Sequence, residues 1–164
     1  MILVAFSQPH TKMYTLYIKI EDSSATEYYD NLLKTFTIDN AGVDLMTCES
    51  WDGSVTHLLN LGVSAMLTRT ETGEVVHYWL LPRSSIYKTG YMMGNSVGVI
   101  DKTYRGTLKA PVVCVGGSTA RGFVAGDRHF QIVAPDMGPI RDIKLVESLP
   151  VTARGSGGFG STGN

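Results

Sequence analysis

From Ala41 onward the chain repeats one pattern, in which short runs of apolar and β-branched residues are separated by turn residues. Runs of this composition are typical of β-strands, and their regular spacing is typical of strands joined by tight connections. The expected strands are 56–69, 75–81, 96–100, 107–115, 129–134 and 143–148. The pattern therefore predicts an all-β fold, a jelly-roll-like barrel or sandwich.

Two further elements are expected before this region. Residues 13–20 are rich in β-formers and partly alternate, which predicts a strand. Ser24 followed by Glu27 resembles a capping box that opens a short helix over about 24–35, to which we assign no chemistry. We expect one β domain over 1–153 and a separate flexible tail over 154–164.

The composition excludes several classes of protein. A chain of 164 residues fits one domain, and a formal net charge of −1 argues against stable binding to nucleic acid or to an acidic membrane. The apolar start, 1–6, is too short for a secretion signal or a membrane span. Cys48 and Cys114 are too few for a disulfide framework, so we expect an intracellular protein with reduced thiols.

The tail combines glycine with groups that suit a nucleotide. Arg154 can grip phosphate oxygens through its fork of donors, and Phe159 can cover the face of a flat ring. Glycines between them leave backbone N–H groups free to point at the same oxygens. Composition alone leaves a second interpretation open, an ordinary mobile Gly/Ser terminus.

Two short internal segments place polar groups next to expected strands. Asp44 follows Gly42 at the start of the β region, where it could be an ordinary turn residue or a metal-site carboxylate. Pro82 ends a strand, and Arg83 with the hydroxyls that follow forms a set suited to phosphate. An exposed loop arginine beside turn serines is the alternative for the second segment.

The stretch 94–106 is the most informative internal segment. The Asn95 amide can donate to and accept from a base edge, and Gly98 allows a ligand to approach the strand closely. Asp101 and Tyr104 bracket a turn, so a carboxylate and a ring can flank one sugar. A plain hairpin with a capping aspartate and a core tyrosine remains open for this segment.

The segment 126–131 gives a turn followed by a strand with polar residues. Strict alternation would place Arg128 and Phe130 on one face and His129 with Gln131 on the other, unless a bulge resets it. We expect a structural role for His129.

These five segments resemble, in order, the five motifs of the trimeric dUTPase family, and the tail sequence RGSGGFGSTG matches almost letter for letter. The resemblance begins near Ile38 and covers about three quarters of the chain. It implies hydrolysis of dUTP to dUMP and pyrophosphate, which limits uracil in DNA and supplies dUMP for dTMP synthesis. In the fourth motif His129 occupies a place that is usually apolar.

The resemblance also implies a role for each matching residue. Asp101 is the base that aims water at the α-phosphorus, and Tyr104 stacks on deoxyribose and leaves no room for a 2′-hydroxyl. Asp44 and Gln131 hold the water shell of a Mg²⁺ ion. The other residues implied to bind substrate are Arg83, Ser84, Ser85, Asn95, Gly98, Val99, Ile100, Arg128, Arg154, Phe159, Gly160, Ser161 and Thr162.

The family further implies a homotrimer with shared active sites. One subunit provides the first, second and fourth motifs, a second provides the hairpin, and a third sends its tail across as a lid. Two alternatives stay open, a dCTP deaminase-like enzyme of the same fold and a nucleotide-sensing regulatory protein that kept the pocket. The scattered histidines and the two cysteines have no zinc-ligand spacing, and no P-loop, Rossmann or GxSxG motif is present.

Overall fold

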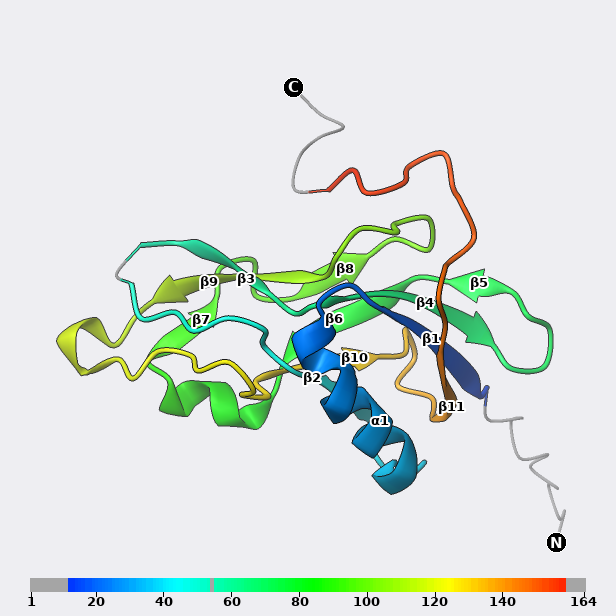
Figure 1. Cartoon of the computed structure of the whole chain (residues 1–164), viewed down its shortest axis with the longest axis horizontal. Helices are drawn as coiled ribbons and strands as arrows, with labels where there is room; N and C mark the ends of the chain where they lie inside the picture. The colour runs from blue at the N-terminus through cyan, green and yellow to red at the C-terminus, as the bar shows by residue number, and fades with distance from the viewer. Residues whose placement is uncertain (1–11, 54, 159–164) are drawn as a thin grey trace, which may run out of the picture.

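The structure is a computed structural model that describes residues 12–53 and 55–158. In these ranges the chain is mostly β-sheet with a single α-helix, α1 (Thr26–Thr35) (Figure 1). The strands are β1 (Tyr14–Ile20), β2 (Gly42–Leu45), β3 (His57–Asn60), β4 (Val63–Arg69), β5 (Val75–Val76), β6 (Tyr78–Pro82), β7 (Tyr91–Met93), β8 (Gly98–Ile100), β9 (Lys109–Cys114), β10 (Phe130–Val133) and β11 (Ile140–Leu145). Three short 3-10 helices are η1 (Ser23–Ala25), η2 (Ser84–Lys88) and η3 (Gly117–Thr119).

The strands form three sheets that share one apolar core. Their orders are β11-β1-β4-β5, β2-β10-β6-β8 and β3-β9-β7. Among the described strands all pairings are antiparallel except that of β1 with β11. The jelly-roll-like all-β expectation is confirmed, and among the described strands the sheets do not close into a barrel.

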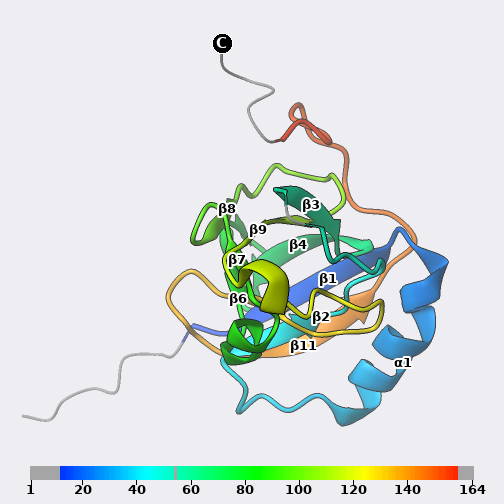
Figure 2. The same cartoon turned by 90° about the vertical axis from the view of Figure 1, so that its left-hand side faces the viewer.

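The core is built from side chains that point inward from all three sheets. Phe130 and Ile132 alternate with the half-buried Gln131 along β10, which is the pattern of a strand with one buried face. The other large, fully buried side chains include Tyr14, Leu16, Ile18, Leu45, Leu59, Leu67 and Leu80. Figure 2 shows α1 against one side of this β body. No helix in the described part of the chain is long and apolar enough to cross a membrane.

Several expected elements differ in detail from the structure. The expected strand 56–69 is two strands, β3 and β4, because Gly62 turns the chain between them with a φ of +66°. The expected strand 75–81 is likewise divided at His77 into β5 and β6. The short strand β7 was not expected, and β11 begins three residues earlier than the predicted 143–148.

The capping box predicted at Ser24 and Glu27 is wrong. The carboxylate of Asp22 instead accepts a hydrogen bond from the Ser24 N–H at 3.0 Å, which opens η1. This 3-10 turn continues into α1 at Thr26, and the N-cap residue of α1, Ala25, offers no side-chain bond. The helix itself is confirmed.

Gly62 provides a test of this chain reversal. Its positive φ disfavours any side chain, and a Cβ at this place would collide with Sγ of Cys48. Gly62→Ala should therefore destabilise the fold by about 2–4 kcal/mol, through backbone strain plus overpacking. Gly73→Ala is the matched control, because φ is +71° but a Cβ would meet nothing within 4 Å. Thermal unfolding should show the larger loss for Gly62, and equal losses would contradict the packing argument.

Candidate active site

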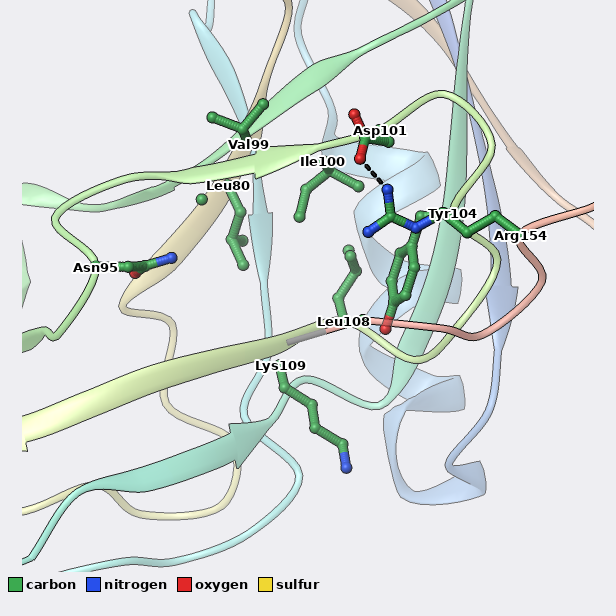
Figure 3. A pocket seen from close by; sticks show the side chains of 11 residues that line it. Leu80, Asn95, Val99, Ile100, Asp101, Tyr104, Leu108, Lys109 and Arg154 are labelled. Atoms are coloured by element: carbon green, nitrogen blue, oxygen red, sulfur yellow. Dashed lines mark hydrogen bonds and ion pairs between the residues drawn. The ribbon is translucent and has the colours of Figure 1, made fainter. Parts of the chain in front are cut away.

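One cavity lies beside the segment 94–106, which contains β8 and is called the β8 hairpin below. It encloses about 160 Å³ and is lined by Leu80, Asn95, Gly98, Val99, Ile100, Asp101, Tyr104, Leu108, Lys109, Arg154 and Gly158 (Figure 3). Gly98 of β8 is buried against Leu80 of β6. A Cβ at Gly98 would lie 3.0 Å from the Leu80 Cβ, so glycine lets β8 pair closely with β6. The sequence-predicted hairpin residues therefore do gather around one hollow.

Asp101 lines this cavity and is paired with one basic side chain. One carboxylate oxygen, Oδ2, accepts from the Arg154 guanidinium (Figure 3). The other, Oδ1, lies 3.4 Å from Nδ1 of His77, and this nitrogen accepts a hydrogen bond from the Lys102 N–H at 3.2 Å. His77 was missed by sequence analysis because only the pairing of β6 with β8 brings it beside the turn.

Tyr104 forms one wall of the same cavity. Its hydroxyl donates to the Thr107 carbonyl at 3.0 Å, and the Arg154 guanidinium lies 5.8 Å from the ring centroid. Burial raises the pKa of the Tyr104 hydroxyl, opposed by the charge of Arg154. The ring is thus fixed as a neutral flat surface, which suits a sugar or base.

A second cavity, of about 320 Å³, lies at the end of β2 and β6. Its lining is polar and consists of Asn40, Ala41, Gly42, Asp44, Arg83, Ser84 and Gln131. Asp44 and Gln131 are direct partners across the β2–β10 pair, so their side chains share one face. Arg83 is held by two partners: its Nε lies 2.9 Å from Asp44 Oδ1, and its Nη1 donates to the Arg128 carbonyl at 2.8 Å.

The charged groups of this second cavity suit the binding of a phosphate anion together with a metal cation. Burial raises the pKa of the Asp44 carboxyl above its ordinary value, and the positive charges of Arg83 and Arg128 oppose that rise. The residues described by the structure contain no cluster of three His, Cys, Asp or Glu side chains that could enclose a metal directly. One carboxylate and one amide oxygen fit a magnesium ion that keeps its waters and takes its other ligands from phosphates.

Some predicted site residues lie outside both cavities. Ser85 is turned toward His129, whose Nδ1 is 2.9 Å from its Oγ, and the exposed Arg128 side chain lines neither cavity. The predicted contacts of Phe159, Gly160, Ser161 and Thr162 fall outside the described residues.

His129 is a buried residue, with 6% of its surface exposed. Its ring lies between Ser85 and Asp127 and edge-on to Phe123, and burial lowers its pKa, so the ring is neutral near pH 7. His129 and Phe130 are both buried, so the strict alternation expected across this segment is wrong; β10 begins only at Phe130. These contacts agree with the expected structural role of His129.

The two cavities share no residue of the described chain. One holds a ring and a carboxylate suited to a nucleoside, and the other holds the basic and hydroxyl groups suited to phosphates. A jelly-roll-like domain that carries both kinds of pocket indicates a protein that binds nucleotides.

Comparison with known proteins makes this class specific. The family model described as dUTPase matches residues 37–163, and the chain belongs to the dUTPase family. It is 31% identical over 151 residues to a deoxyuridine 5′-triphosphate nucleotidohydrolase of Ralstonia pickettii (strain 12J), covering 89% of this chain and 96% of that protein. The enzyme of the same name from Escherichia phage T5 is 37% identical over 109 residues, 65% of this chain and 68% of that one.

The fold agrees with a solved structure of the family. A dUTPase of Staphylococcus bacteriophage 80alpha superposes with a TM-score of 0.55 at 17% identity, over 82% of this chain and 97% of that one. At this identity the likeness shows the fold alone.

Proposed function

We propose that this chain, as a member of the dUTPase family, hydrolyses dUTP to dUMP and pyrophosphate, with Asp101 as the base. The single observation that carries this assignment is Asp101 at the mouth of a cavity walled by Tyr104 and the β8 hairpin. An ionised aspartate can orient a water molecule and take its proton as the water attacks the α-phosphorus. The bond to the β-phosphate breaks, and pyrophosphate leaves.

The second cavity is the proposed site for the triphosphate. Arg83 and Ser84 would bind phosphate oxygens there, and Asp44 with Gln131 would hold Mg²⁺ through its waters. The bound ion supplies neutralisation of charge on the phosphates. Arg128, Arg154 and Ser85 would complete the donor set once substrate orders the site, because such chemistry depends on positioning and electrostatics.

A homotrimer with shared sites is the proposed assembly. Asp101 and the Asp44–Arg83 cavity have no common lining in one chain, so two copies placed side by side would combine one half from each. An apolar surface is present to support such contact. Trp79, Leu81, Val97, Val133 and Met137 line an apolar hollow, at which Met137 is 65% exposed.

The nucleotide specificity tests the proposed function. Pyrophosphate release should be fastest with dUTP when dUTP, dTTP, dCTP and UTP are compared in parallel in the presence of Mg²⁺. Ammonia released from dCTP would instead indicate the deaminase alternative, which no comparison favours. Intact dUTP after incubation with the pure protein and Mg²⁺ would refute the assignment.

Tyr104 should control the choice between deoxyribose and ribose. Replacing it with alanine removes the wall of the cavity, so the discrimination between dUTP and UTP, as a ratio of kcat/KM values, should fall about 10–100-fold. Tyr104→Phe keeps the ring and loses only the hydroxyl that bonds to Thr107, so it should keep most of the discrimination. An unchanged ratio in the alanine variant would exclude a role for this ring in sugar selection.

A further inference from the structure

Helix α1 lies outside the region matched by the family model, yet it contacts the strand that carries Asp44. The Tyr28 hydroxyl donates a hydrogen bond to the Asp44 backbone carbonyl at 2.9 Å. The family match begins at residue 37, whereas α1 spans Thr26–Thr35. The second cavity, which is the proposed phosphate site, is therefore supported by an element that lies outside the family motifs.

The position of β2 explains why this bond matters. Among the described strands, β2 is at the edge of its sheet and pairs with β10 alone, through Asp44 opposite Gln131. An edge strand leaves backbone groups without a partner on its free side. Tyr28 provides a donor for the backbone carbonyl of Asp44. Asp44 is the residue of β2 that would face the proposed metal.

The Tyr28 ring is held by packing. It meets the ring of Tyr29 edge-on, with centroids 4.8 Å apart, and lies partly buried against the apolar core. Packing thus fixes the ring that carries the donor hydroxyl.

We propose that Tyr28 is a positioning residue for the magnesium–triphosphate site, acting through the backbone of Asp44. The helix then belongs to the support of the active site rather than serving only as a surface element. This inference rests on the proposed function, since Asp44 must be the carboxylate that holds the waters of Mg²⁺. Groups behind first ligands commonly fix their orientation and so set the affinity for the metal.

Tyr28→Phe and Tyr29→Phe form a matched pair for the test. Both remove one hydroxyl from adjacent positions of α1 and keep the ring, but the buried Tyr29 hydroxyl has no hydrogen-bond partner among the described residues. The parent enzyme is first shown to hydrolyse dUTP, so a failure of the proposed function is seen separately. Mg²⁺ binding is then titrated by calorimetry in the presence of a non-hydrolysable imido analogue of dUTP.

Tyr28→Phe should weaken Mg²⁺ binding about three- to tenfold or more and raise the Mg²⁺ concentration needed for half-maximal turnover by the same factor. Turnover at saturating Mg²⁺ should recover toward that of the parent. Tyr29→Phe should match the parent in both measurements. Equal Mg²⁺ binding in the two variants would overturn the proposal, even if Tyr28→Phe unfolds at a lower temperature, because that result would mean a purely structural hydroxyl.

Discussion

Asp101→Asn should keep dUTP bound and stop its hydrolysis. Asparagine has the size of aspartate, so the cavity walled by Tyr104 and the β8 hairpin should keep its shape. The amide cannot take a proton from water, and a lost general base typically costs about 10²–10⁴ in rate. Single-turnover measurement of pyrophosphate release should show this loss in the rate constant of hydrolysis. Calorimetry with dUTP should give a dissociation constant within a few-fold of that of the parent.

The control for this prediction is Asp142→Asn. Asp142 lies on the exposed face of β11 and lines neither cavity, so the same chemical change should leave turnover unaltered. Unaltered turnover in Asp101→Asn would remove Asp101 from its role as base. A large loss of binding would show instead that its charge mainly holds Arg154.

The sequence predicted the fold class because strands and turns are local signals. The Glu-Thr-Gly-Glu turn between β4 and β5 agrees with the structure. Breaks within strands could not be predicted in this way. The composition of 56–69 favours β throughout, whereas in the fold the chain turns at Gly62, where a Cβ would collide with Cys48 and crowd Asp22.

In the candidate site, too, the parts formed by residues close in sequence could be predicted, and the parts formed by packing could not. The hairpin residues Asn95–Tyr104 are close in sequence, so one motif predicted one cavity. The pairing of Asp44 with Gln131 depends on the register of β2 and β10, which a single sequence does not contain. Tyr28 lay in a helix without any motif, and its bond to Asp44 depends on how the helix packs.

Removing residues 154–164 should leave a folded protein with almost no turnover. β11 ends at Leu145, and none of the described tail residues from 154 to 158 is buried in the core, so size and thermal midpoint should change little. The truncation takes away the Arg154 charge at Asp101 and the backbone contact to Arg105. Loss of a charge-assisted donor and of a lid that excludes water should lower kcat about 10²–10³-fold.

Arg154→Lys separates the two effects of that truncation. Lysine keeps the positive charge and the rest of the tail but loses the planar fork of donors that can bind two phosphate oxygens at once. Its kcat should therefore fall between those of the parent and the truncated protein, with thermal stability equal to both. Full turnover in the truncated protein would show that the tail has no part in catalysis, and the pairing of Arg154 with Asp101 would then be only a feature of the substrate-free chain.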